Sequence, residues 1–191
     1  MNWLDELFTT LKLGDNINMV GLSYGGWITT QYALRLPERL NKIVLLAPAC
    51  TVLPLSYKWV FRAMLCVVPH RYFTKSFIYW LLDDLAKTSK EGRVSIEEYV
   101  DESYLALRSF KTKRMVNPTV LTDEELRSIN VPTLYLVGEN EKIYSVPKAI
   151  ERLNEIAPQI KTEVIPSAGH DLTIVQAEIV NGKILDFLKF I

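Results

Sequence analysis

Ser23 lies in the sequence Gly-Leu-Ser-Tyr-Gly at residues 21–25, a glycine–x–serine–x–glycine pattern. This pattern is typical of a nucleophilic serine on a sharp turn between a strand and a helix. An apolar run at 17–22 precedes the turn and predicts a strand, and a helical pattern follows it as far as Leu36. Such a turn would raise the Ser23 hydroxyl above the edge of a sheet. We therefore predict that Ser23 is a nucleophile for acyl transfer; the alternative is a chance glycine-rich turn.

The neighbours of Ser23 also have predicted parts in this chemistry. Glycines at 21 and 25 would let the backbone of the turn pass without a clash with a Cβ atom. The N–H of Tyr24 would point from the start of the helix toward the negative oxygen that develops on the substrate. We therefore predict that Tyr24 is a donor of the oxyanion hole.

His170 is the candidate general base. It is one of two histidines, and it lies in a loop directly after the apolar run at 161–165. Loops at the carboxyl ends of parallel strands form the binding sites of open α/β sheets. A lone histidine is more often structural, but this position, downstream of Ser23 and after the last strand, favours catalysis. The other histidine, His70, follows Pro69 in a helical stretch, and we predict that it is a surface residue.

A carboxylate must hold the imidazole in place and stabilise its charged form. Two candidates, Glu139 and Glu141, follow the apolar run that ends at Val137, and either could instead be a solvated loop charge. Asp171 is a weaker rival, because side chains next to each other in sequence seldom face each other. The resulting chain order is serine, acid, histidine, which is the order found in α/β-hydrolases.

The elements that must position these residues alternate along the chain. Apolar runs predict strands at 17–22, 43–47, 132–137 and 161–165, and helical patterns occupy 1–12, 25–36, 149–156 and 172–190. The sequence Thr-Asp-Glu-Glu at 122–125 is a capping box that opens a further short helix. Strands that alternate with helices and lack polar alternation predict an α/β fold with a mostly parallel sheet covered on both faces.

The middle of the chain has another character. We predict helices at 57–68 and 72–85, and a third that begins at the capping box Ser95–Glu98 and ends near 108–113. This predicts two parts, an α/β core at 1–48 and 119–191 and a helical cap at 49–118. Large side chains of the cap could line an apolar pocket, although most of them could simply pack the cap: Tyr57, Trp59, Phe61, Met64, Tyr72, Phe73, Phe77, Tyr79 and Trp80. Trp27 is expected to pack its helix.

Several further motifs carry a family resemblance. They are Leu-Pro-Glu-Arg-Leu at 36–40, Thr-Asp-Glu-Glu-Leu-Arg-Ser at 122–128, Val-Pro-Thr-Leu at 131–134, Gly-Glu-Asn-Glu-Lys-Ile at 138–143 and Ala-Gly-His at 168–170. With the Ser23 pattern, they resemble the α/β-hydrolase superfamily, and within it bacterial carboxylesterases that act on arylpropionate esters. The resemblance implies a triad of Ser23, Glu141 and His170, with glutamate where most relatives have aspartate.

This resemblance implies hydrolysis of small carboxylic esters through an acyl-enzyme, with no metal and no organic cofactor. Hydrolysis of lactones, amides or carbon–carbon bonds would use the same triad. The alternative from another class is a non-catalytic remnant that acts as a binding module.

The resemblance also implies that the N-terminal third of the fold is missing, since only 22 residues precede Ser23. A second oxyanion donor would then be absent, and losing one donor lowers the rate by on the order of 10²–10³. The strand at 16–21 would be buried on both faces but unpaired along one side. An open edge of this kind pairs with other chains, so we expect a homo-oligomer.

Composition excludes other classes of protein. The chain has 191 residues, 22 basic and 22 acidic, and 49% of its residues are hydrophobic, so it is neither disordered nor a dedicated nucleic-acid binder. Cys50 and Cys66 form neither a disulfide framework nor a metal motif, which favours a reducing compartment. The start of the chain has no signal-peptide pattern, and the apolar stretch 52–68 is too short and too charged to span a membrane. We therefore expect a cytoplasmic protein.

Overall fold

The fold is built on a sheet of four parallel strands, seen in a computed structural model that describes residues 2–110 and 116–189. The strands follow one another in space in their chain order, β1 (Ile17–Leu22), β2 (Leu40–Leu46), β3 (Thr133–Gly138) and β4 (Lys161–Ile165). The register pairs Val20 with Val44 and Ile43 with Thr133. The predicted α/β class with a parallel sheet is therefore confirmed.

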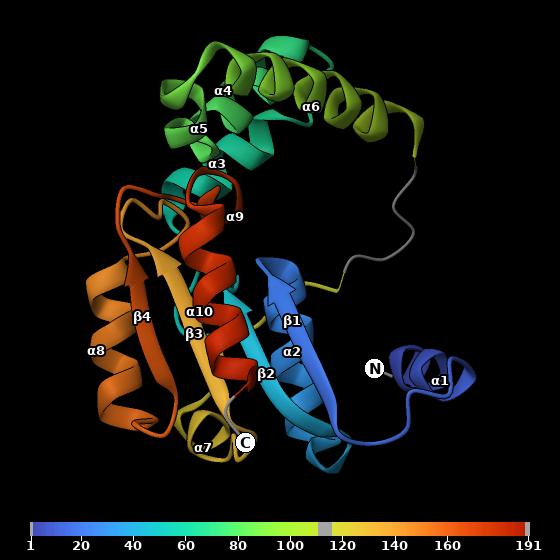
Figure 1. Ribbon diagram of the computed structural model, residues 1–191. Coiled ribbons are helices and arrows are strands. Elements are labelled where there is room, and N and C mark those ends of the chain that lie inside the picture. The colour runs from blue at the N-terminus through green and yellow to red at the C-terminus, as the bar shows by residue number, and fades with distance from the viewer. Residues whose placement is uncertain (1, 111–115, 190–191) are drawn as a thin grey trace.

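Helices cover both faces of this sheet (Figure 1). On one face lie α2 (Tyr24–Arg35) and α8 (Val146–Ile156), which pack on alternate strand residues such as Ile43, Leu45 and Tyr135. On the other face lie α9 (Leu172–Val175) and α10 (Ala177–Lys189), which pack on Val44 and Leu134. Because both faces of β2 and β3 are buried, their central residues, 43–46 and 134–137, are continuous apolar runs instead of alternating ones.

Four helices form a separate layer beyond the carboxyl ends of the strands (Figure 1). We call them the helical group: α3 (Tyr57–Leu65), α4 (Arg71–Leu81), α5 (Asp83–Thr88) and α6 (Lys90–Ser109). They have their own small core, which includes Ile78, Ile96 and Val100. The described residues between 49 and 118 contain no strand.

The shorter elements complete the chain. They are α1 (Asn2–Thr10), the 3₁₀ turn η1 (Pro37–Arg39) and α7 (Asp123–Arg127). The capping box that opens α7 is confirmed, since the Thr122 hydroxyl accepts from the Glu125 N–H and the Glu125 carboxylate accepts from the Thr122 N–H. No helix in the described residues is long and apolar enough to cross a membrane.

Several helix boundaries differ from the sequence prediction. The helix expected at 57–68 ends at Leu65, and the helix expected at 72–85 is divided at Leu82 into α4 and α5. Helix α6 begins at Lys90, where Ser89 caps it by accepting from the Gly92 N–H, and the Ser95 hydroxyl donates instead to a carbonyl within the helix. The last helix is divided at Gln176 into α9 and α10. Met1, residues 111–113 and Phe190, which the prediction also placed in helices, lie outside the described residues.

Strand β1 also differs from its prediction, because it is buried on one face only. Asn18, Val20 and Leu22 are exposed, while Gly21 on the opposite face is buried. The exposed residues pair with β2 residues that α9 and α10 cover, and this cover does not extend to β1. Strand β1 is therefore an edge strand with one apolar face open to solvent.

Candidate active site

Ser23 occupies the turn between β1 and α2 in a strained conformation, with φ 54° and ψ −117°. A residue with a Cβ rarely adopts this region, and such strain persists only where the surrounding structure holds it. The Ser23 N–H donates to the Leu46 carbonyl at 2.9 Å, and its own carbonyl accepts from the N–H groups of Gly26 and Ala49, both at 3.0 Å. The end of β2 therefore fixes the serine at the carboxyl end of β1.

Of the two glycines that the sequence predicted to be necessary in this turn, one is confirmed and the other is not. A Cβ on Gly21 would overlap the Gly25 carbonyl and lie 2.5 Å from the Thr29 hydroxyl, so that prediction holds for Gly21. A Cβ on Gly25 would meet nothing within 4 Å, so the prediction of a close contact there is wrong. The second tight position is Gly26, where a Cβ would lie 2.7 Å from the Cβ of Pro48.

The loops after β3 and β4 bring Glu141 and His170 together. Glu141 Oε2 lies 2.8 Å from His170 Nδ1. The Glu141 side chain is fully buried and that of His170 is 10% exposed. The second carboxylate oxygen of Glu141 accepts from the N–H groups of Lys142 and Ile143. The carboxylate is therefore fixed by its own loop and can orient the imidazole.

Ser23 and His170 line the same cavity, which has a volume of about 440 Å³. Within the described residues, the Ser23 hydroxyl makes no hydrogen bond, so the serine and the histidine share a space without being joined. In enzymes without substrate, catalytic hydrogen bonds are often long and tighten only when substrate binds. The arrangement can therefore support proton transfer between Ser23 and His170 around a bound substrate.

The Tyr24 N–H stands at the start of α2. It has no acceptor among the described residues, so it is available to a negative oxygen near Ser23. The Tyr24 ring stacks on Trp27 with centroids 5.5 Å apart, and its hydroxyl donates to the Val116 carbonyl. Trp27 is buried and donates to the Thr119 carbonyl, as expected for a packing residue.

Among the described residues, neither of the other candidate acids hydrogen-bonds His170, although Asp171 lines the same cavity. The Glu139 carboxylate accepts from the Ser167 N–H. Asp171 is buried and accepts from the N–H groups of Gly169 and Leu85, which joins the His170 loop to the helical group. Burial raises the pKa of Asp171 above its ordinary value. His70 is exposed, as predicted, and caps α4 by accepting from the Tyr72 N–H.

Apart from Ser23 and His170, the side chains that line their shared cavity were not predicted from the sequence. None of the nine aromatic and methionine side chains proposed from sequence faces it. Its wall on the helical group is mostly aliphatic, with Leu81, Leu82, Leu85 and Ile96 beside Ser95 and Tyr99. Their place depends on how α5 packs against α9, which local sequence patterns do not encode. Among the described residues, no group of three or more His, Cys, Asp or Glu side chains could hold a metal ion.

Comparison with known proteins adds a family match. The family model described as serine aminopeptidase, S33, matches residues 4–175. Two curated relatives from Bacillus subtilis are each 33% identical to the chain, an uncharacterized carboxylesterase named nap and the carboxylesterase YbfK. The matches cover 98% and 97% of this chain but 61% and 62% of those proteins. The chain therefore spans about three fifths of the length of the curated relatives it matches.

A solved structure gives the same result in three dimensions. The crystal structure of naproxen esterase (carboxylesterase NP) from Bacillus subtilis superposes with a TM-score of 0.85 at 33% sequence identity. The match covers 98% of this chain and 65% of that one.

Proposed function

Because the chain belongs to the serine aminopeptidase S33 family and has the α/β-hydrolase fold, we propose that it hydrolyses carboxylic esters with Ser23 as the nucleophile. The observation that carries the proposal is the buried Glu141–His170 pair, which opens onto the same cavity as the strained Ser23. The carboxylesterase relatives support an ester as the substrate class.

The reaction proceeds in two halves. His170 takes the proton of the Ser23 hydroxyl while the serine oxygen attacks the ester carbonyl, and Glu141 holds the imidazole so that its other nitrogen faces the serine. The tetrahedral intermediate collapses, the alcohol leaves with the proton from His170, and an acyl-enzyme remains. Water then gives a proton to His170 and attacks the acyl group. His170 returns this proton to the leaving Ser23 oxygen, which releases the acid and restores the Ser23 hydroxyl.

The Tyr24 N–H supplies one donor for the oxyanion. Backbone donors of this kind act because they are already in place before charge develops. Removal of one donor typically lowers kcat by about 10²–10³. A chain that offers the Tyr24 N–H alone is therefore expected to be slower, by about this factor, than one with two donors.

The helical group acts as a cap over this chemistry, within the segment 49–118, on the core formed by 1–48 and 119–191. Leu82, Leu85 and Ile96 give the cavity an apolar roof opposite Ser23. The hydrogen bond from the Leu85 N–H to Asp171 holds this roof next to His170. An apolar wall of this kind favours the hydrocarbon part of an ester and excludes water from the acyl-enzyme.

We infer the oligomeric state of the protein from the edge of β1 and its compartment from its two thiols. The open edge of β1 would pair with a second copy of the chain. Cys50 and Cys66 are both free and buried, which suits a reducing compartment such as the cytoplasm.

Hydrolysis of p-nitrophenyl butyrate by the 191-residue chain tests the proposal. We expect turnover that is lost in Ser23→Ala and kept in Ser128→Ala, whose serine lies at the end of α7 and bonds the Glu125 carbonyl. A fluorophosphonate probe should also label Ser23, with loss of fluoride, and mass spectrometry of the peptides would locate the label. A chain that is folded by circular dichroism but shows neither turnover nor labelling would be a non-catalytic binding module. Turnover of lactones or amides but not of esters would assign the other chemistry of the same triad.

A further inference from the structure

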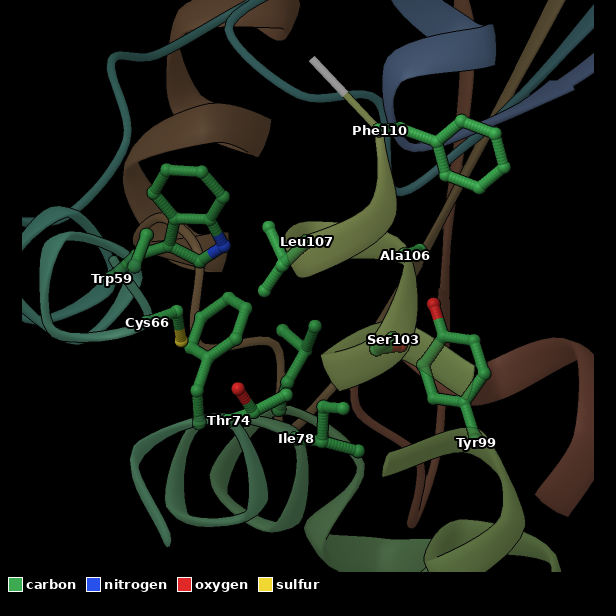
Figure 2. A pocket seen from close by; sticks show the side chains of 12 residues that line it. Trp59, Cys66, Thr74, Ile78, Tyr99, Ser103, Ala106, Leu107 and Phe110 are labelled. Carbon is green, nitrogen blue, oxygen red and sulfur yellow. The ribbon is translucent and has the colours of Figure 1, made fainter. Parts of the chain in front are cut away.

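A second cavity lies inside the helical group, between α3, α4 and α6, and has a volume of about 490 Å³ (Figure 2). Trp59 of α3 and Cys66, which directly follows α3, stand on one side of it. Thr74 and Ile78 of α4 form its floor, and a face of α6 lines the other side. Its size is within the range of cavities that hold small organic molecules.

The α6 wall of this cavity is a complete helical face. Residues 99, 103, 106, 107 and 110 recur at three- and four-residue spacing and all line the space, as Tyr99, Ser103, Ala106, Leu107 and Phe110. Such a face normally packs against neighbouring helices. Here the first half of α6 does so, through Ile96 and Val100. In the second half Leu107 and Phe110 stay exposed, and Arg108 bonds the carbonyls of residues 66–68, which follow α3. An apolar space is therefore left between this face of α6 and the helices α3 and α4.

The chemistry of the lining points to a neutral ligand. None of the described side chains around the space is charged, and most are aliphatic or aromatic. Thr74 is 2% exposed, and its hydroxyl has no nitrogen or oxygen partner among the described residues; it interacts there with the Cys66 thiol, which is a weak hydrogen-bonding group. By contrast, the hydroxyls of Thr29 and Thr30 in α2 bond the carbonyls four residues before them. A buried polar group of this kind needs a partner, so the floor of the cavity offers one hydrogen-bonding group to a bound molecule.

The cavity also adjoins the catalytic one. Leu81 and Tyr99 line both spaces. Leu81 ends α4, and Tyr99 lies on the half-exposed side of α6, so the two spaces meet at these side chains. A molecule bound at Ser23 could therefore extend past Leu81 and Tyr99 into the helical group.

We propose that the cavity between α3, α4 and α6 is a second compartment of the substrate site. It takes a neutral, apolar part of the ester that is remote from the scissile bond, an aryl group or an alkyl chain, with one hydrogen-bonding atom at Thr74. This inference rests on the proposed function for the ester bond itself. It adds that the substrate has two parts, a reacting end next to Ser23 and a bulky end in the helical group.

Two neighbouring residues of α6 give a matched test. Ala106→Trp places a large ring in the cavity, whereas Leu105→Trp adds the same ring at an exposed position that does not line it. The substrates are p-nitrophenyl butyrate, p-nitrophenyl decanoate and decyl butyrate, so that the long chain is on either side of the ester. We expect Ala106→Trp to lower the ratio of long-chain to short-chain kcat/KM at least tenfold for one of the long esters. Leu105→Trp should leave that ratio unchanged.

A binding measurement separates this inference from the catalytic proposal. The neutral fluorescent probe N-phenyl-1-naphthylamine should bind Ser23→Ala protein, and the added change Ala106→Trp should weaken its binding at least tenfold. Thr74→Val, which keeps the shape and removes the hydroxyl, should weaken it about threefold to tenfold, as expected for one neutral hydrogen bond. If probe binding responds in this way but the protein has no esterase activity, the cavity is a binding site and the proposed ester hydrolysis is wrong. If Ala106→Trp and Leu105→Trp have the same ratio of long-chain to short-chain kcat/KM and bind the probe equally well, the proposal of a second compartment is wrong.

Discussion

Gly26, in the first turn of α2, lies against Pro48, which follows β2. A Cβ on Gly26 would come within 2.7 Å of the Pro48 Cβ and 3.0 Å of its Cα. The same residue donates its N–H to the Ser23 carbonyl at 3.0 Å. The approach of the helix to the end of β2 is therefore set at Gly26, and this approach holds Ser23 in its strained conformation.

Gly26→Ala should consequently destabilise the protein. An added methyl group that has no space displaces the Pro48 segment, and overpacking of this kind costs about 1–3 kcal/mol. Gly25→Ala is the matched control, because its Cβ would meet nothing and alanine favours a helix by about 1 kcal/mol over glycine. Urea denaturation measures both free energies of unfolding. Equal stability of the two variants would show that the Gly26–Pro48 contact does not set the turn.

Glu141 and Glu139 offer a second matched pair, two residues apart on one loop. In Glu141→Gln the amide nitrogen would face His170 Nδ1, which favours the tautomer whose other nitrogen carries a proton and cannot act as a base. We expect kcat for p-nitrophenyl butyrate to fall by about 10²–10⁴, with little change in stability. Glu139→Gln should stay within about threefold of the parent, since its carboxylate contacts the Ser167 N–H and not the histidine. Comparable losses in both variants would contradict the assignment of Glu141.

Local sequence patterns correctly predicted those elements whose formation depends on residues close together in the chain. The capping box at Thr122 and the strand β4 at 161–165 both agree with the sequence analysis. The start of α6 does not agree with the sequence analysis, although Ser95 begins a capping-box sequence. Helix α6 starts earlier because Ser89 caps it, at a point where Gly92 packs so closely on α5 that a Cβ there would lie 2.7 Å from the Leu85 carbonyl. This contact depends on the approach of α5, which no local spacing reveals.

The same distinction applies to the site. The proximity of Glu141 and His170 could be expected, because each follows the carboxyl end of a parallel strand and β3 pairs with β4. The aliphatic roof of Leu82 and Leu85 could not be expected, because it depends on the packing of the helical group on α9. The aromatic side chains that stood out in the sequence mostly point elsewhere, and only Trp59 and Phe77 of the nine line either of the two cavities described above.

Glu97 makes the stability of the helical group sensitive to acid. Its carboxylate bonds Lys75 at 2.5 Å, Tyr79 at 2.7 Å and Arg71 at 2.9 Å, and these hydrogen bonds lower its pKa from 4.5 to about 2. The folded protein thus binds fewer protons than the unfolded chain between these two values. The stabilisation is complete above the unfolded pKa and is lost as the pH falls toward the folded one.

We therefore expect the urea midpoint of the parent protein to fall more between about pH 5 and about pH 3 than that of Glu97→Gln. Glu98→Gln is the control, because Glu98 makes no ion pair among the described residues. The urea midpoint of Glu98→Gln should therefore fall with pH as much as that of the parent protein. A Glu97→Gln profile that runs parallel to the parent profile would show that this cluster contributes nothing to acid sensitivity.

The two edges of the sheet differ in their protection, and this leads to a prediction about assembly. Strand β4 carries Lys161 and Glu163, which pair with each other, and charged side chains protect an edge from pairing with another chain. Strand β1 has the sequence Ile-Asn-Met-Val-Gly-Leu, without a charge, and Val20 is 46% exposed on its open face. We expect β1 to pair with β1 of a second copy about a two-fold axis.

Sedimentation velocity at micromolar concentration should then show a dimer that Val20→Lys converts to a monomer, because a lysine on this face would have to be buried against the second copy. Val164→Lys is the matched control, since Val164 on β4 is 43% exposed and lies at the other edge. It should leave the dimer intact. A parent protein that sediments as a monomer, or a dimer that survives Val20→Lys but not Val164→Lys, would show that β1 is not the surface through which the chain associates.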